Sequence, residues 1–287
     1  MEPAVVVRQR LDELSESIVF QGDARVALPL LPDNSVQICC TSPPYWSLRD
    51  YQTPGQIGLE PTIDQFLNRL VEVFAQVKRI LRPDGVLWLS IGDAYTSGDR
   101  GYRAPDKKNP VRAMSYRPDT PDGLKPKDLI GLPWRLAFAL QRDGWYLRSD
   151  IIWHKTNCMP ESVKDRPTKA HEYVFLLSKS ERYYYDHRSM REANGRNKRT
   201  VWSIPTQPFK GAHFATFPPA LIEPLIRATS RPGDFVLDPF LGSGTTALVA
   251  AQMDRKYVGV EVNRDYVNLS IQRLRNVFED TRLALAE

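Results

Sequence analysis

The chain has 287 residues, of which 42% are hydrophobic and 25% charged, a composition typical of a soluble globular protein with one main domain. No apolar run approaches the roughly 20 residues that span a bilayer, and the amino end lacks the apolar core of a signal peptide, so we expect a cytoplasmic protein with no membrane partner. Three cysteines, of which Cys39 and Cys40 are adjacent, suggest neither a disulfide framework nor a metal cluster of familiar spacing.

The formal net charge of +5 and the pI near 9.0 suit a polyanionic partner, but such values are also common in proteins that bind no nucleic acid. The distribution of charge is more informative, because arginine and lysine gather in residues 100–127 and 179–199. Both segments are rich in Gly, Pro, Asn and Tyr, so we expect basic surface loops there.

Taken in chain order, short apolar runs bounded by turn residues predict buried strands at residues 17–20, 36–41, 86–91, 172–177, 235–237 and 257–260. The clearest helical pattern opens at Thr62, carries apolar side chains on one face through Leu81, and is expected to stop at Pro83 and Gly85. Further helices are expected at about residues 133–141, 219–228, 245–253 and 264–278. This alternation predicts an α/β sheet wound on both faces.

A glycine-rich motif follows the Phe-Val-Leu strand near the carboxyl end and opens a helix. Gly242, Gly244 and Ala247 fit the G-x-G-x-x-G/A spacing of nucleotide-binding turns, in which the backbone approaches the ligand closely. Glu261 stands 23 positions after Asp238, at the end of the next strand, where a carboxylate can accept hydrogen bonds from both ribose hydroxyls. The alternative is a turn that only packs a helix on a strand, with Glu261 as an exposed charge.

Charge selects among the nucleotides that such a turn could bind. A dinucleotide would place a pyrophosphate beside Asp238, which carries the same sign of charge. S-adenosylmethionine has no phosphate, and its sulfonium and ammonium groups are favourable partners for a carboxylate at the strand tip. The motif therefore predicts S-adenosylmethionine as the cofactor.

A second motif, Thr-Ser-Pro-Pro-Tyr, ends the predicted strand at residues 36–41. Two consecutive prolines lack the N–H donor and cannot continue a strand, so we expect a rigid loop with outward carbonyls. Ser42 and the carbonyl of Pro43 can accept hydrogen bonds from an exocyclic base amine and so favour its pyramidal, nucleophilic form. Tyr45 can stack on the base and contribute about 1–3 kcal/mol. The alternative is a Pro-Pro turn with a satisfied core tyrosine.

Together, the two motifs resemble those of the β-class DNA amino-methyltransferases, in which the catalytic motif precedes the cofactor motif. The resemblance covers nearly the whole chain and implies a Rossmann-like, doubly wound mixed sheet in a single catalytic domain, residues 1–287, with no metal. It assigns catalysis to Ser42, Pro43, Pro44 and Tyr45. It assigns cofactor binding to Asp23, Phe217, Pro218, Asp238, Pro239, Phe240, Gly242, Ser243, Gly244, Thr245 and Glu261. In the family, the acid matching Asp23 contacts adenine and the segment around Phe217 closes over the methionine moiety.

The identity of Ser42 bears on the target base. Family members with Asp before Pro-Pro-Tyr mostly methylate adenine N6, whereas Ser is more frequent among cytosine N4 enzymes. Ser42 therefore favours cytosine N4, methylated by direct displacement on a base flipped out of the duplex. Carbon-5 methylation is disfavoured because it needs a thiolate that adds to the ring, and Cys39 and Cys40 lie before the turn. Asp93 either lines the same pocket or serves as a turn residue.

The family places its recognition element in the interval that here spans residues 181–210, which is short. The basic insertion at residues 97–127 is therefore expected to share the contacts with double-stranded DNA, the alternative being a solvated loop. The expected DNA-binding residues are Arg100, Arg103, Lys107, Lys108, Arg112, Arg191, Arg196, Lys198 and Arg199. A DNA-modifying enzyme would be nucleoid-associated, and the resemblance leaves open a homodimer and a restriction endonuclease in the same system.

Other interpretations stay open at this point. An adenine-N6 enzyme of the same family is opposed only by Ser42. A catalytically inactive DNA-binding member of the fold is opposed by the intact catalytic motif, Asp238 and Glu261. An RNA or protein glutamine methyltransferase is a further alternative, because related loops serve amines on those substrates, and the two basic segments favour nucleic acid without naming it.

Overall fold

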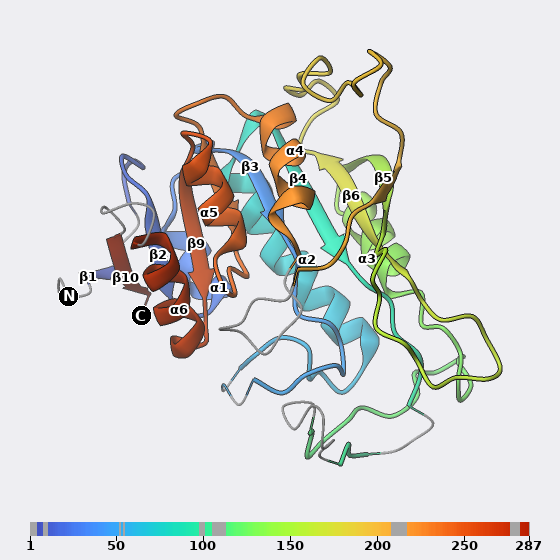
Figure 1. Ribbon diagram of the computed structural model, residues 1–287. Helices are drawn as coiled ribbons and strands as arrows, with labels where there is room; N and C mark the ends of the chain where they lie inside the picture. Colours follow the sequence, from blue (N-terminus) through green and yellow to red (C-terminus); the bar gives the residue numbers. More distant parts are fainter. Residues whose placement is uncertain are drawn as a thin grey trace.

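The computed structural model describes residues 5–7, 11–51, 53, 55–97, 101–104, 113–207, 217–275 and 282–286. Within them a ten-stranded sheet has the order β1-β10-β2-β9-β8-β3-β4-β6-β5-β7, in which β6 alone runs antiparallel to its neighbours (Figure 1). The strands are β1 (Val5–Val7), β2 (Ile18–Gln21), β3 (Val36–Thr41), β4 (Leu81–Ile91), β5 (Tyr146–His154), β6 (His171–Ser178), β7 (Val201–Ser203), β8 (Phe235–Asp238), β9 (Lys256–Glu261) and β10 (Arg282–Ala286). The helices are α1 (Ala24–Ala27), the 3-10 turn η1 (Leu28–Leu30), α2 (Ile63–Ile80), α3 (Leu132–Arg142), α4 (Pro219–Thr229), α5 (Thr245–Gln252) and α6 (Arg264–Arg275).

Helices cover both faces of this sheet (Figure 1). The side chains of α2 and α3 build one buried core, and those of α4, α5 and α6 build a second core on the opposite face. Strand β4 shows how one sequence serves both, because Leu87 and Leu89 belong to the first core while Trp88 between them belongs to the second. Such alternation is what a strand buried on both faces requires. The predicted doubly wound α/β fold is confirmed.

Helix α2 forms because apolar residues such as Phe66, Leu70 and Phe74 recur at helical spacing and are buried. At its start, the hydroxyl of Thr62 accepts a hydrogen bond from the N–H of Gln65 at 3.2 Å and caps the first turn. The helix begins where the sequence predicts.

The helix ends before Pro83, as predicted, but one residue short of Leu81. Leu81 already has an extended backbone, with φ −63° and ψ 141°, and it begins β4 by pairing with Val36 of β3. Pro83 and Gly85, which were expected to stop the helix, instead lie in an irregular stretch of β4 before the regular pairing resumes at Val86. Arg82 directly precedes Pro83, and the residue before a proline is pushed towards extended backbone, which suits the start of a strand as well as the end of a helix.

Some elements were missing from the sequence prediction, namely β1, β5, β7, β10 and α1. Strand β5 carries Arg148, Ser149 and Asp150 in its middle, which interrupt the apolar run that would reveal a strand. Its pairing with β6 and β7 decides the conformation instead. The last predicted helix is present as far as Arg275, and residues 276–278 lie outside the described part of the chain. Among the described helices, none combines the length and the apolar character needed to cross a membrane.

The order of the strands creates a switch point. From β3 the chain continues through α2 to β4 on one side, and from β8 it continues through α5 to β9 on the other, while β3 and β8 lie side by side. In open α/β sheets, ligands bind at the carboxyl ends of the strands where the winding reverses. Both sequence motifs follow these two strands, so the fold brings them to the same edge.

Candidate active site

The Ser-Pro-Pro-Tyr loop leaves the sheet where β3 ends. Pro43 is buried, whereas Ser42, Pro44 and Tyr45 are half-buried. Just beyond the loop, Trp46 Nε1 donates to the carbonyl oxygen of Glu60 at 2.9 Å and fixes the direction in which the chain leaves. The structure therefore holds this loop at the carboxyl edge, as the motif predicts.

The phenol of Tyr45 is held by a charged pair. Its hydroxyl donates to Glu172 Oε2 at 3.0 Å, and Lys155 Nζ lies 2.5 Å from Glu172 Oε1. Burial and the nearby Glu172 charge raise the pKa of Tyr45 well above its usual value, while hydrogen bonding by the side chain of Ser42 and the backbone of Gly92 acts in the opposite direction. Glu172 and Lys155 are not predicted from the sequence, because they come from β6 and from the residue after β5, far from Tyr45 along the chain.

Asp238 ends β8 and is fully buried. Its Oδ1 accepts hydrogen bonds from Thr41 Oγ1 at 2.6 Å and from the N–H of Phe240 at 3.1 Å, and its Oδ2 accepts one from Thr246 Oγ1 at 2.7 Å. Burial raises the pKa of Asp238 to about 6 in spite of these bonds. Because Thr41 directly precedes Ser42, the Thr41–Asp238 bond ties the catalytic strand to the glycine-turn strand.

Glu261 ends β9, the strand next to β8. Its Oε2 accepts from the N–H of Gly242 at 2.8 Å, and its Oε1 accepts from the N–H of Asn263 at 2.8 Å. Burial, with a smaller effect from the Asp238 charge, raises the pKa of Glu261 to about 7. Tyr51 and Tyr266, whose ring centroids are 6.5 Å apart, lie near enough for the Glu261 charge to raise the pKa of each phenol, although burial is the larger cause. The sequence prediction missed both tyrosines.

Helix α6 supports the glycine turn from behind. Arg273 Nη1 donates to the carbonyl oxygen of Ser243 at 3.2 Å and to Thr245 Oγ1 at 3.0 Å. Ser243 and Thr245, both predicted to bind the cofactor, are buried and engaged in this contact. Arg273 was not predicted, because the contact joins two helices that are separated by a strand.

Gly244 in this turn has φ +80°, and a Cβ built there would lie 2.9 Å from the Cβ of Ser270 on α6. Gly244→Ala is expected to lower the free energy of unfolding by about 2–4 kcal/mol, because left-handed strain and overpacking add. Urea unfolding measures this. Gly233→Ala is the matched control: φ there is +84°, but the added Cβ meets nothing within 4 Å, so only the strain of about 1–2 kcal/mol remains. Equal losses in the two variants would contradict the packing argument.

The remaining predicted cofactor residues have different surroundings. The carboxylate of Asp23 caps α1 and is paired with Arg25, whose Nη2 lies 2.5 Å from Asp23 Oδ2. Burial would raise the pKa of Asp23, but the hydrogen bonds from Arg25 outweigh it and lower the pKa. Pro239 and Phe240 follow Asp238 in the turn. Phe217 packs on the core around α4 and α5, and Pro218 caps α4.

The carboxylates suit the predicted cofactor. Asp23, Glu261 and Asp238 follow β2, β9 and β8, which are neighbours in the sheet, so three acidic groups gather at one edge. A Cβ added at Gly242 would meet only the carbonyl oxygen of Phe240, at 4.0 Å, so the backbone of the turn stays open to a ligand. This donor set matches a cofactor with two cationic groups, a ribose and no phosphate.

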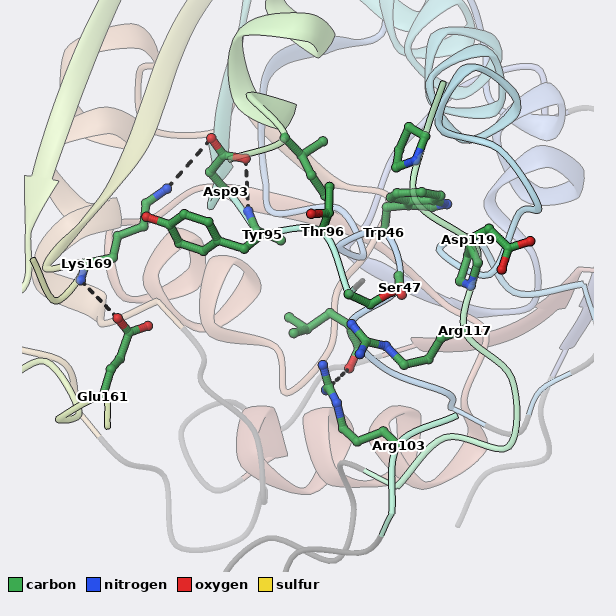
Figure 2. Close-up of a pocket in the computed structure, with 16 residues that line it drawn as sticks. Trp46, Ser47, Asp93, Tyr95, Thr96, Arg103, Arg117, Asp119, Glu161 and Lys169 are labelled. Atoms are coloured by element: carbon green, nitrogen blue, oxygen red, sulfur yellow. Dashed lines mark hydrogen bonds and ion pairs between the residues drawn. The ribbon is translucent and has the colours of Figure 1, made fainter. Parts of the chain in front are cut away.

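A pocket of about 220 Å³ lies between the chain that follows Tyr45 and the basic insertion (Figure 2). Trp46 and Ser47 line one side, and Arg103 and Arg117 line another. Arg103 Nη1 also donates to the carbonyl oxygen of Leu48 at 3.3 Å, which attaches the insertion to the chain just after the Ser-Pro-Pro-Tyr loop. The pocket therefore adjoins the catalytic loop without including Ser42 or Tyr45.

Asp93, for which the sequence left two roles open, is a turn residue that also lines this pocket; because the pocket does not include Ser42 or Tyr45, a place beside the target base stays a prediction. Its Oδ1 accepts from the N–H groups of Ala94 at 2.9 Å and of Leu132 at 3.0 Å, so it acts as a turn residue and meets the start of α3. Its Oδ2 lies 3.8 Å from Lys169 Nζ at the wall of the pocket (Figure 2). Burial lowers the pKa of Lys169 although Asp93 acts in the opposite direction.

The structure does not bring the two predicted DNA-contact segments together. The described residues of the insertion, 97, 101–104 and 113–127, lie beyond the carboxyl end of β4. The segment that follows β6 begins at the opposite edge, where the N–H of Tyr184 donates to the carbonyl of Asp84 at 3.0 Å (Figure 1). On that second segment the predicted residues Arg191, Arg196, Lys198 and Arg199 are all exposed. Of the predicted residues in the insertion, Arg100, Lys107, Lys108 and Arg112 lie outside the described part of the chain.

Comparison with known proteins agrees with this geometry. A family model described as DNA methylase, N6_N4_Mtase, matches residues 36–272. The chain belongs to this family. The type II methyltransferase M.Cfr9I of Citrobacter freundii is 62% identical over 275 residues, covering 94% of this chain and 91% of the relative. M.SmaI of Serratia marcescens, also named a type II methyltransferase, is 56% identical over 262 residues, covering 89% and 90%.

Solved structures give the same result. TTHA0409 from Thermus thermophilus, determined in complex with S-adenosyl-L-methionine, has a TM-score of 0.66 and 28% identity over 95% of this chain and 98% of that one. The cytosine-N4-specific PvuII DNA methyltransferase has a TM-score of 0.69 at 21% identity, covering 96% and 98%, and its likeness shows the fold. This chain is a type II DNA methyltransferase of the N4/N6 family and uses S-adenosylmethionine, as predicted.

The raised carboxyl pKa values predict how cofactor binding by this methyltransferase depends on pH. Asp238 and Glu261 must be ionised to complement a cation and accept ribose hydroxyls, but their pKa values are about 6 and about 7. The dissociation constant of S-adenosylmethionine should therefore rise as the pH falls from 8 to 5.5, by up to about tenfold per pH unit for each proton that binding expels. Calorimetric titration measures it, and a constant affinity would contradict the assignment.

The stability of the cofactor-free protein should change in the opposite sense. Both carboxyl pKa values are raised above those of the unfolded chain, about 4, so between pH 4 and 7 the native state binds more protons. Its free energy of unfolding should therefore fall as the pH rises through this window. Glu261→Gln removes one titrating group and should flatten both pH dependences.

Proposed function

We propose that this methyltransferase transfers the methyl group to the exocyclic N4 amine of cytosine in double-stranded DNA. The proposal is supported by the bond from Thr41 to Asp238, 2.6 Å long, which places Ser42 next to the carboxylates suited to the cofactor. It also uses the identity of Ser42, since serine before Pro-Pro-Tyr resembles the cytosine N4 enzymes. The catalytic assignment of Ser42, Pro43, Pro44 and Tyr45 and the cofactor assignments are part of the proposal.

The chemistry follows from the position of the loop. S-adenosylmethionine, when bound, supplies a methyl group on a sulfonium. Ser42 Oγ and the carbonyl oxygen of Pro43 accept hydrogen bonds from the two N–H groups of the target amine, so the nitrogen becomes pyramidal and its lone pair becomes available. Tyr45 holds the base by stacking. The nitrogen forms a bond to the methyl carbon as the carbon–sulfur bond breaks, and the amine then releases a proton to solvent.

No cysteine takes part in this scheme. Cys39 and Cys40 are fully buried in β3, and burial raises the pKa of each thiol well above its usual value. A buried thiol with a raised pKa is a poor nucleophile. This surrounding supports direct transfer to nitrogen over carbon-5 chemistry.

The substrate side of the site is the basic insertion. An exocyclic amine inside a duplex is out of reach, so we propose that the base is flipped out at a cost of a few kcal/mol. The pocket that adjoins the loop of Tyr45 is lined by Arg103 and Arg117 and also by Asp93, Asp119 and Glu161, so we propose that the two arginines themselves, and not a net positive charge, contact the backbone that delivers a flipped base. We propose that the DNA also contacts Arg191, Arg196, Lys198 and Arg199, which are exposed on the segment that begins at the other edge.

Four further predictions belong with the proposal. We propose a single catalytic domain spanning residues 1–287, a nucleoid-associated enzyme, and a restriction endonuclease that recognises the same sequence. A homodimer is compatible with the site and is tested by sedimentation.

The decisive experiment identifies the methylated nucleoside. The purified protein is incubated with S-adenosylmethionine and unmethylated DNA, the DNA is digested to nucleosides, and the products are separated by mass spectrometry. N4-methylcytosine is the expected product. N6-methyladenine would overturn the choice of base while keeping the mechanism, and the absence of any methylated nucleoside despite cofactor binding would point to an RNA or protein substrate.

A further inference from the structure

The charged pair behind Tyr45 has no part in the scheme above. Lys155 and Glu172 are only 17% and 18% exposed, and Lys155 Nζ also lies 4.6 Å from the centre of the Trp153 ring. Glu172 reaches the catalytic edge because β6 is antiparallel, so its amino end lies where the neighbouring strands have their carboxyl ends. A buried ion pair is weak evidence for a stabilising role, so the position next to Tyr45 calls for another explanation.

Counting donors and acceptors gives this contact a direction. An ammonium only donates and a carboxylate only accepts, so Glu172 beside Lys155 can accept from Tyr45 but cannot donate to it. The single proton of the Tyr45 hydroxyl therefore points at Glu172 Oε2, 3.0 Å away. The phenol oxygen keeps two lone pairs, one for the backbone of Gly92 and one that can accept a hydrogen bond from the Ser42 hydroxyl, three residues earlier on the same loop.

We propose that the Lys155–Glu172 pair orients the Ser42 hydroxyl through Tyr45, so that a lone pair of Ser42, and not its proton, faces the target amine. In this chain of hydrogen bonds, Lys155 donates to Glu172, Tyr45 donates to Glu172, Ser42 donates to Tyr45 and the amine donates to Ser42. Glu172 is thus a positioning residue. The inference deepens the proposed function and rests on it.

The packing around the pair supports a fixed geometry. A Cβ added at Gly92 would lie 3.0 Å from both Tyr45 Cε2 and Glu172 Oε1, so only a glycine allows these groups to meet over β4. Lys169 and His171 are the other titratable groups that feel the Glu172 charge, and neither reaches Glu172 in a described hydrogen bond. Lys155 is therefore the described cation that holds the carboxylate.

Glu172→Gln tests the direction of the chain. A carboxamide can donate as well as accept, so the Tyr45 and Ser42 hydroxyls can reverse and present a proton to the amine. We expect kcat to fall on the order of 10- to 100-fold. The dissociation constant of S-adenosylmethionine should stay within about twofold of that of the unmodified protein. The extent of base flipping, measured with a fluorescent base analogue at the target position, should also stay within about twofold. Tyr45→Phe keeps the stacking ring but breaks the chain, so it should cause a similar loss of kcat.

The discriminating measurement is a double-mutant cycle. If Glu172 acts through Ser42, the Glu172→Gln change should cost less than about twofold in kcat once Ser42 is already alanine. Glu223→Gln, an exposed carboxylate on α4 paired with Arg227, is the control and should change nothing. Additive losses from Glu172→Gln and Ser42→Ala would overturn the inference, as would a change in cofactor affinity that explains the lost rate. Methylation of DNA by the unmodified protein is measured first, so that a failure of the proposed function can be distinguished from a failure of the inference about Glu172.

Discussion

Replacing Asp238 with asparagine is expected to weaken S-adenosylmethionine binding by about 10- to 100-fold while leaving the fold intact, since a hydrogen bond or contact with a charged group contributes about 1.5–3 kcal/mol. The asparagine side chain has the same shape and can keep hydrogen bonds with Thr41, Thr246 and the N–H of Phe240. What it loses is the negative charge beside the cationic cofactor. Calorimetric titration gives the affinity, and thermal unfolding without cofactor gives the stability.

Thr246→Val is the matched control for this variant. It removes one hydroxyl that donates to Asp238 Oδ2 but leaves the carboxylate in place. We expect a loss of about 0.5–1.5 kcal/mol in unfolding free energy and a change in cofactor affinity of less than about threefold. If Asp238→Asn bound the cofactor as tightly as the unmodified protein, the charge argument for this carboxylate would be wrong.

The parts of the site that follow a strand directly could be predicted from sequence. Ser42, Asp238 and Glu261 each stand at the end of an apolar run, and in a doubly wound sheet such ends meet at one edge. Local spacing, together with the rule that the carboxyl ends of parallel strands meet at one edge of the sheet, therefore suffices to predict that these residues share a site. The glycine turn can also be predicted, because it is recognised from the local spacing of Gly242 and Gly244 and from the helix that directly follows them.

The parts that depend on pairing between distant segments could not be predicted. Glu172 reaches Tyr45 only because β6 enters antiparallel between β4 and β5, and a run of apolar residues does not reveal its direction. Arg273 supports the glycine turn from α6. In the sequence it looks like an ordinary basic residue in the last turn of a helix. Both contacts are decided by the packed fold.

The two basic segments illustrate the same limit. Their composition is alike, so the sequence suggested that they share one DNA surface. Residues 97–127 follow a strand that ends at the catalytic edge, whereas the later basic segment follows the strand of opposite direction and so begins at the other edge. Composition predicts that a loop is basic, but the direction of the preceding strand decides where the loop lies.

Ser42→Ala is expected to lower kcat by about 100- to 1,000-fold, which is the usual loss when one hydrogen-bonding group aimed at the reacting atoms is removed. The dissociation constant of S-adenosylmethionine should change little, because the described cofactor carboxylates keep their partners. Thr41→Val, one position earlier, provides the contrast: it breaks the 2.6 Å bond to Asp238 but keeps the Ser42 hydroxyl, so it should slow transfer far less than Ser42→Ala and, like Thr246→Val, should change cofactor affinity by less than about threefold. Single-turnover methylation with saturating cofactor separates the two effects. If both variants altered affinity and rate alike, the division between a catalytic loop and a cofactor edge would fail, and Ser42 would have to be placed with the groups that shape the cofactor site.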